Sequence, residues 1–148
     1  MELKVLQNLK KGPYVEFNST GKHWDDSSLF LDEIIFGVFA DSFRASNVDF
    51  NYFGPTSYNQ TDLLKLSNDL QNFNSLLLQI SDFESFIKII SCSGLGNQFL
   101  GELEYSEKVN LNARWSETLV ALRKINVALL TLVQNFAKED QVLWVFGI

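Results

Sequence analysis

The clearest pattern in the chain is an apolar stripe in its middle third. Its members recur at steps of three and four residues: Leu63, Leu66, Leu70, Phe73, Leu77 and Ile80. This spacing places the six side chains on one face of a helix, while Asn and Ser fill much of the opposite face. The sequence therefore predicts a long amphipathic helix that is capped by Asn59 or Thr61 and packs into a core.

A second apolar segment precedes this helix. Ser27 or Ser28 can cap a helix that has the acids Asp32 and Glu33 near its start and runs to about Ser46. Its apolar side chains surround the helix axis rather than lining one side of it: Phe30, Ile34, Phe36, Val38, Phe39 and Phe43. A helix that is apolar around its circumference belongs at the centre of a core.

Two further helices are predicted downstream. Ser81-Asp82-Phe83-Glu84 is a capping box, which starts a short helix that ends around Ser91. Residues 97–110 are compatible with one helical turn or a loop. The longest helix should then run from a cap at Asn110 or Asn112 to about Ala137. Its inner face is predicted to hold Trp115, Leu119, Leu122, Leu129, Val133 and Phe136, broadened by Val120, Val127 and Leu130.

Two short segments at opposite ends of the chain predict β structure. Residues 14–18 (YVEFN) alternate weakly, and residues 141–147 (QVLWVFG) are β-branched and aromatic, so the two can pair. Residues 47–58 form an aromatic connection, either an ordered loop or a short extended piece. The expected fold is mostly α, a helical bundle of four to five helices with this minor β element. The length predicts a single domain over residues 1–148.

Composition narrows the function. The 148 residues carry 12 Lys and Arg against 18 Asp and Glu, for a net charge of −6. A strongly basic nucleic-acid binder is therefore not expected. One Cys and one His exclude a disulfide framework and a multi-Cys zinc site, so no metal or cofactor is expected. The N-terminus lacks a signal-peptide core, and Arg123 and Lys124 interrupt the most apolar stretch. We expect a cytoplasmic protein without a membrane partner.

Catalytic candidates are limited to His23 and Cys92. His23 stands beside Trp24, Asp25 and Asp26, where a carboxylate could orient it as a general base, and Cys92 could supply a Cys–His nucleophile. The flanks of Cys92 match no protease signature, and no nucleophile lies near His23 in sequence. We interpret His23 as a surface residue and Cys92 as a packed thiol, and we expect a protein that is not an enzyme.

Acidic charge is concentrated in residues 23–58, which hold six carboxylates against Arg44 alone. The same segment is rich in aromatics, which can anchor a partner that charge has steered into place. The predicted partner-binding residues are Trp24, Asp25, Asp26, Asp41, Asp49, Tyr52, Phe53 and Tyr58. In the other interpretation these aromatics fill the core and the acids simply face water.

The segment DFNYFGPTSYNQTDLLKLSNDL (Asp49 to Leu70) joins an aromatic Gly-Pro loop to the amphipathic helix. In this small acidic chain it resembles the bacterial immunity proteins of polymorphic toxin systems, including contact-dependent growth inhibition. The resemblance implies a cytoplasmic, stoichiometric inhibitor of a cognate toxin domain, often a nuclease. Such inhibitors plug a basic active site or block its substrate path, and Asp and Glu would mimic phosphates. The alternative is a helical adaptor or oligomerisation domain, in which the stripe from Leu63 to Ile80 is a seam for a partner helix.

Overall fold

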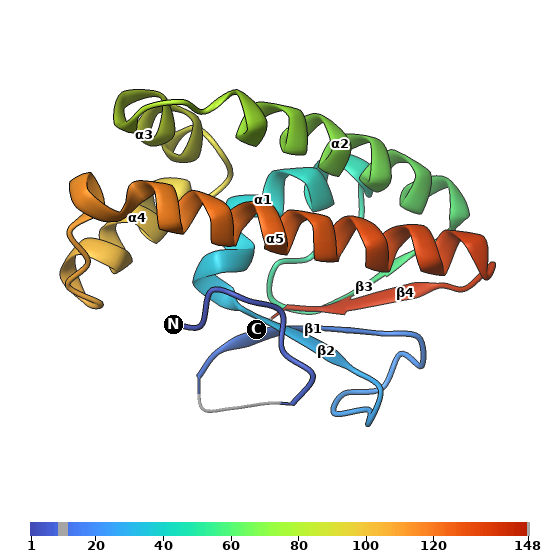
Figure 1. The fold of residues 1–148 in the computed structure, drawn as a ribbon. Coiled ribbons are helices and arrows are strands. Elements are labelled where there is room, and N and C mark those ends of the chain that lie inside the picture. Colours follow the sequence, from blue (N-terminus) through green and yellow to red (C-terminus); the bar gives the residue numbers. More distant parts are fainter. Residues whose placement is uncertain (9–11, 148) are drawn as a thin grey trace.

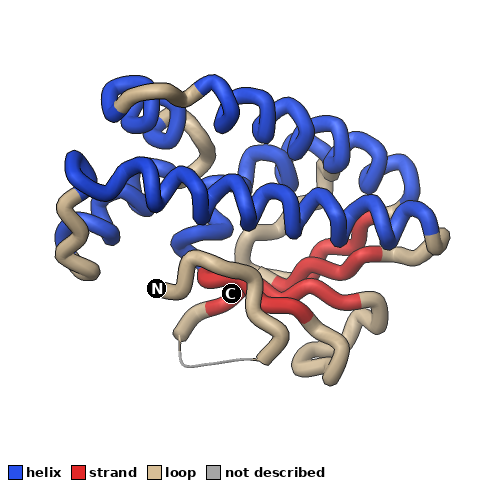
Figure 2. The backbone as a smooth tube through the Cα atoms, in the orientation of Figure 1, coloured by secondary structure: helices blue, strands red, loops and turns tan. Residues whose placement is uncertain are grey.

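A layer of helices covers one face of a small antiparallel sheet (Figures 1 and 2). The computed structural model describes residues 1–8 and 12–147. In these residues the chain forms, in order, β1 (Tyr14–Asn18), β2 (Leu29–Asp32), α1 (Glu33–Ser46), β3 (Pro55–Tyr58), α2 (Gln60–Gln79), α3 (Phe83–Ser91), α4 (Gly96–Tyr105), α5 (Leu111–Lys138) and β4 (Leu143–Phe146). The expected class, mostly α with a minor β element, is confirmed.

The sheet has the strand order β2-β1-β4-β3, with every neighbouring pair antiparallel. The prediction that residues 14–18 pair with the C-terminal segment is confirmed, because Glu16 lies opposite Phe146 on β4. On its other side Glu16 lies opposite Phe30 on β2. Residues 47–58 combine both predicted possibilities, a loop followed by the short strand β3.

The start of the first helix was predicted too early. Leu29–Asp32 is a strand rather than the first turn of a helix, and α1 begins only at Glu33. Alternation explains the strand, because Leu31 faces the helices beside Val15 while Phe30 faces the other side of the sheet. The N-cap is Asp32 rather than Ser27 or Ser28, and its carboxylate accepts a hydrogen bond of 3.0 Å from the backbone of Ile34.

The central apolar stripe is core. All six side chains from Leu63 to Ile80 are buried, and α2 packs between α1 and α5. The rings of Phe39 and Phe73 meet edge to face across the α1–α2 contact at 5.6 Å. Asn59 caps the helix, in a capping box with Asp62. The stripe is therefore not available to bind a helix of a partner protein, and this version of the adaptor hypothesis is wrong.

The remaining helices follow the sequence with small corrections. The capping box of α3 joins Asp82 to Ser85, one residue later than predicted, and the ambiguous residues 97–110 form most of α4. Asn110 caps α5 as expected. Val120 and Val127 were assigned to the inner face of α5, but both are about half exposed, so that face is narrower than predicted.

By length and composition alone, α5 is the one helix among the described residues that could cross a membrane. The core helix of a soluble protein passes the same test, and α5 packs along α2 through buried side chains such as Leu122, Leu129 and Val133.

The two faces of the sheet differ in what covers them. The inner face packs on α1, where Phe17 meets Phe36 and Phe43 with ring centroids 6.1 and 5.9 Å apart. The outer face looks away from the helices, and the β1–β2 loop (residues 19–28) folds over it (Figure 1). This loop builds the site described next.

Candidate binding site

The β1–β2 loop lies directly on aromatic side chains of β4. Gly21 has φ of 69°, and a Cβ at this position would stand only 2.9 Å from the indole of Trp144, so the close approach requires glycine. Two residues later, the imidazole of His23 packs on Phe146 with ring centroids 4.1 Å apart. The loop is therefore held by ring packing at two points.

A buried carboxylate holds the loop from beneath. Glu16 is only 4% exposed. Its Oε1 atom accepts hydrogen bonds from Asn18 Nδ2 at 3.0 Å, from the backbone N–H of Trp24 at 2.9 Å and from Ser28 Oγ. Its Oε2 atom lies 3.1 Å from His23 Nδ1. Because hydrogen bonds to a carboxylate are stronger than neutral ones, one side chain fixes both ends of the loop.

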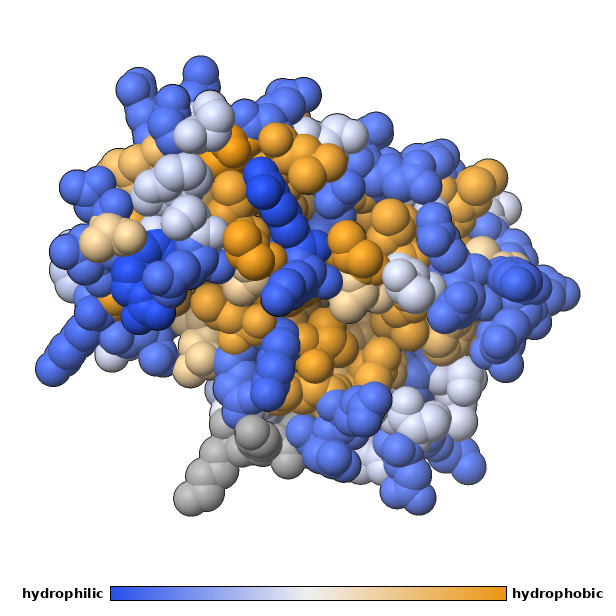
Figure 3. Space-filling model, viewed as in Figure 1, coloured by the Kyte–Doolittle hydropathy of each residue, from blue (hydrophilic) through white to orange (hydrophobic). Residues whose placement is uncertain are grey.

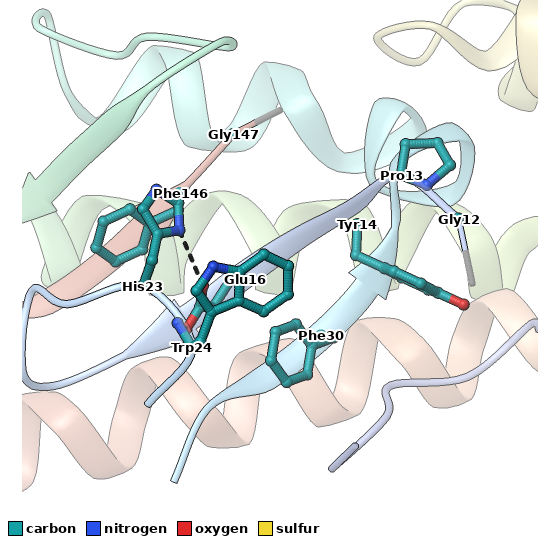
Figure 4. Close-up of a pocket in the computed structure, with 9 residues that line it drawn as sticks. All are labelled: Gly12, Pro13, Tyr14, Glu16, His23, Trp24, Phe30, Phe146 and Gly147. Atoms are coloured by element: carbon teal, nitrogen blue, oxygen red, sulfur yellow. Dashed lines mark hydrogen bonds and ion pairs between the residues drawn. The ribbon is translucent and has the colours of Figure 1, made fainter. Parts of the chain in front are cut away.

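Beside Glu16 the outer face is hollowed into an open cavity of about 250 Å³. Its lining residues come from β1, β2, β4, the β1–β2 loop and the residues that flank β1 and β4: Gly12, Pro13, Tyr14, Glu16, His23, Trp24, Phe30, Phe146 and Gly147. Figure 4 shows the side chains of His23, Trp24 and Phe30 gathered around Glu16, with His23 over the ring of Phe146. The walls are mostly aromatic, and Glu16 supplies a carboxylate at the base.

Trp24 at the edge of this cavity is held in an unusual way. It is 67% exposed, although tryptophan is one of the largest apolar side chains. Its backbone has φ of 64°, in the left-handed region that costs a non-glycine residue about 1–2 kcal/mol. The hydrogen bond from its N–H to Glu16 stabilises this conformation. The sequence thus keeps an indole in solvent on a strained backbone, which favours a role in binding.

The neighbouring acids differ in their roles. Asp25 is part of the loop itself, because its Oδ1 accepts a hydrogen bond of 3.0 Å from the backbone of Ser27. Hydrogen bonds from Ser27 lower the pKa of the Asp25 carboxyl, so Asp25 is charged at neutral pH. Asp26 is exposed, and no ion-pair partner for it occurs in the described residues.

The α1–β3 connection (residues 47–54), which holds further predicted residues, meets the cavity at Gly147. The carbonyl of Gly54 accepts a hydrogen bond of 3.1 Å from Gly147, which lines the cavity. Phe53 is 75% exposed, and Asp49 is exposed as well. Tyr52 is half-buried against Phe50, and burial raises the pKa of its hydroxyl to about 12.

Two predicted residues have other roles. Tyr58 is fully buried and donates a hydrogen bond of 2.9 Å to the carbonyl of Phe43, so it belongs to the core and not to a surface. Asp41 lies on α1, where it accepts a hydrogen bond of 2.9 Å from the backbone of Gly94 and pairs with Arg44 at 3.1 Å. It therefore ties the α3–α4 connection to α1, away from the loop that carries Trp24.

The catalytic candidates do not meet. Cys92 follows α3 in the helical layer, while His23 belongs to the β1–β2 loop on the face of the sheet that points away from the helices. The expectation that Cys92 is a packed thiol was wrong, since it is exposed. His23 is half-exposed, but it also contacts Glu16 and Phe146. Within residues 1–8 and 12–147, no three His, Cys, Asp or Glu side chains converge as metal ligands.

Sequence reasoning missed Glu16 altogether. The available signal was weak, a single acid between Val15 and Phe17 in a predicted strand, which is the pattern of a solvent-facing position.

Comparison of the chain with protein-family models, with curated proteins and with solved structures found no match. The geometry of the cavity and of the two loops beside it is therefore the observation on which a function can rest.

Proposed function

We propose that this chain is a binding protein without catalytic activity, an immunity protein that neutralises a cognate basic toxin domain of nuclease type in the cytoplasm. One observation carries the proposal. Two exposed aromatic side chains, Trp24 and Phe53, stand on loops that both reach the cavity: Trp24 lines it, and the loop of Phe53 is hydrogen-bonded through Gly54 to the lining residue Gly147. Exposed acids, Asp26 and Asp49, lie near them in the sequence. A stoichiometric complex would cover this surface, which we call the loop surface (residues 23–26 and 49–53).

The physical roles of the two residue types are complementary. Large aromatic side chains contribute most to affinity when a partner buries them, and Trp and Tyr dominate such anchor positions. Carboxylates contribute chiefly to the rate of association, since they attract a basic partner over a distance of about 10 Å at 0.1 M salt. Asp26 and Asp49 are exposed and have no ion-pair partner among the described residues, so their charge is available for this purpose.

The helices supply a rigid base for the loops in this proposal. The α2 helix packs on both α1 and α5, and we infer that the three helices act as a small bundle. The α1–β3 connection is anchored to this base, because Tyr52 packs against Phe36 of α1 with ring centroids 6.0 Å apart. A preorganised loop loses less entropy when a partner binds, which increases affinity.

The proposal is tested with the toxin domain encoded beside the gene for this chain, by co-purification and by association kinetics. The variant carries Asp26→Lys and Asp49→Lys on the loop surface. We expect its association rate to fall at least tenfold at low salt, with a smaller change at high salt.

A matched control carries Glu84→Lys and Glu104→Lys, which change the net charge equally at exposed positions of α3 and α4. We expect a much smaller fall for this control. Equal effects of the two double variants would show that only net charge matters, and the loop surface would then be the wrong interface. A neighbouring gene product that does not bind the chain would contradict the immunity role.

The alternative, a helical adaptor or oligomerisation domain, retains one observation in its favour. Figure 3 shows apolar side chains on the face of the molecule formed by α5, where Val120 and Val127 are about half exposed. Sedimentation distinguishes the two hypotheses. An oligomer that dissociates in the Val120→Asp, Val127→Asp variant would favour the adaptor, and a monomer at all concentrations would count against an oligomerisation domain.

A further inference from the structure

We propose that the cavity beside Glu16 binds the cationic end of a Lys or Arg side chain that the partner protein inserts. The inference rests on the proposed function and adds to it a specific receptor for a basic group. It follows from the buried charge of Glu16, from the aromatic walls and from the size and opening of the cavity.

Charge is the first argument. A carboxylate removed from water is unfavourable unless opposite charge and hydrogen bonds compensate it. The three groups that donate to Oε1 of Glu16 are neutral. Within the described residues, the imidazole of His23 is the only basic group at ion-pair distance, and it meets Oε2; no Lys or Arg side chain pairs with Glu16 there. A carboxylate oxygen accepts more than one hydrogen bond, so Oε2 can also accept from an ammonium or guanidinium group.

The walls are the second argument. Phe30 and Phe146 are the direct cross-strand neighbours of Glu16, so the register places an aromatic ring on each side of the carboxylate. Trp24 contributes the outer wall (Figure 4). A cation within about 6 Å of an aromatic face is attracted by the negative charge of that face, and tryptophan is the strongest partner. The same faces and the carboxylate repel anions.

Size and access are the third argument. The volume of about 250 Å³ is close to the lower end of the range of about 300–1,000 Å³ for ligand pockets. It suits an alkyl chain that ends in a cation. Trp24, at the cavity edge, also belongs to the loop surface, so a partner docked there can reach the cavity. A bare metal ion is disfavoured, because Glu16 is the only carboxylate among the described residues of the lining.

The test is a titration of the full chain, followed by amide and indole NMR signals, with Nα-acetyl-arginine methylamide and Nα-acetyl-lysine methylamide as probes. We expect dissociation constants of about 1 mM, with shifts at the Trp24 indole and the Gly147 amide. The apolar control Nα-acetyl-norleucine methylamide should bind at least tenfold more weakly. Equal binding of norleucine and lysine probes would overturn the proposal.

Two variants localise the binding. Glu16→Gln keeps an oxygen to accept from the loop but removes the charge, and should weaken binding of both basic probes at least tenfold. Trp24→Ala removes a wall at an exposed position and keeps a non-glycine residue on the same backbone, so it carries the test if Glu16→Gln disturbs the fold. We expect a loss of threefold or more. Tyr105→Ala, an exposed aromatic on α4, is the control and should bind as the native chain does.

The outcomes for the cavity and for the proposed function are separable. Binding of the basic probes by a chain that has no protein partner would contradict the immunity role and leave the cavity assignment standing. A partner whose affinity depends on Asp26 and Asp49, but not on Glu16, would overturn the cavity assignment alone. Native-like probe binding by both Glu16→Gln and Trp24→Ala would also overturn it.

Discussion

The two faces of the sheet are stabilised in different ways. On the inner face, Val15, Phe17 and Leu31 are fully buried against the helices, and shape and hydrocarbon contact hold them. On the outer face, Glu16 and Asn18 are equally inaccessible, but a loop covers them through hydrogen bonds. The difference shows that low solvent exposure alone does not identify a hydrophobic core. The buried residues of the outer face are polar, and an open cavity lies beside them.

The magnitudes of the two kinds of interaction indicate where stability and binding reside. Burying a side chain such as Phe17 contributes about 1.5–3 kcal/mol. A hydrogen bond contributes about 0.5–1.5 kcal/mol net, although a buried donor left without an acceptor costs about 1–3 kcal/mol. The inner face should therefore dominate global stability, and the outer face should control the order of one loop.

The largest effect is expected from Phe17→Ala, which leaves a cavity between β1 and α1. We expect the free energy of unfolding to fall by about 3–5 kcal/mol, measured by urea denaturation. Trp24→Ala on the outer side should change it by less than about 0.5 kcal/mol, because the indole is exposed. If the two variants had similar effects, the contrast between the faces would disappear.

The next effect is expected from Glu16→Leu, which removes the acceptor for Asn18, Ser28 and the backbone of Trp24 together. We expect a loss of about 2–4 kcal/mol, and faster hydrogen exchange at Trp24 than in the native chain. Glu16→Gln keeps a carbonyl oxygen as an acceptor, so its free energy of unfolding should fall by less than that of Glu16→Leu. A loop whose exchange is unchanged in Glu16→Leu would mean that packing on Trp144 and Phe146 is sufficient to hold it.

Two tyrosines that both pack on α1 provide a smaller test, of a hydroxyl with an acceptor against one without. The hydroxyl of Tyr58 on the inner face has an acceptor, whereas that of Tyr52 is buried with no hydrogen-bond partner among the described residues. Tyr58→Phe should lower the free energy of unfolding by about 1 kcal/mol, whereas Tyr52→Phe should leave it unchanged or raise it slightly. Urea denaturation measures both.

The dependence of stability on alkaline pH provides a second measurement for Tyr52. Burial raises the folded-state pKa of Tyr52 to about 12, against about 10 in the unfolded chain. Its neutral hydroxyl therefore supports the fold below pH 10, and this contribution is lost as the pH rises through 12. Tyr52→Phe should flatten that part of the curve. An unchanged slope would show that Tyr52 is solvated in the folded chain.

The smallest effect is expected at Asp32, the outward-facing last residue of β2. Partial burial raises the pKa of its carboxyl, so its contribution to stability is lost as the pH rises through that titration. Asp32→Asn keeps a side chain that can cap the helix, and it should raise the free energy of unfolding by less than about 1 kcal/mol at pH 7. The gain should vanish near pH 3, where the carboxyl of Asp32 is protonated in both the folded and the unfolded chain. A net loss at pH 7 would mean that the helix dipole outweighs burial.

The elements that local patterns specify were predictable. The α2 stripe, the caps at Asn59 and Asn110 and the pairing of β1 with β4 all follow from spacing and residue type. The strand β2 was missed, because four residues before a helix contain too little alternation to outweigh helical periodicity. Its identity depends on pairing with β1, which is a tertiary effect.

The candidate site was predictable only in part. The charge asymmetry identified Trp24, Asp26, Asp49 and Phe53, which are exposed. It could not separate them from Tyr58, because an aromatic in an acidic segment has the same local pattern whether it packs inward or outward. Glu16 was hidden for a related reason, since only the return of the β1–β2 loop over the sheet buries it.

The position of β4 between β1 and β3 has a consequence for how the chain assembles. The central strand pair joins segments from opposite ends of the described chain, with all five of its helices in between. Such non-local pairing has a large loop-closure entropy, so the sheet should form late, after the helices have docked. Because Phe146 and Gly147 also line the cavity, the cavity cannot form in a nascent chain until β4 has emerged from the ribosome.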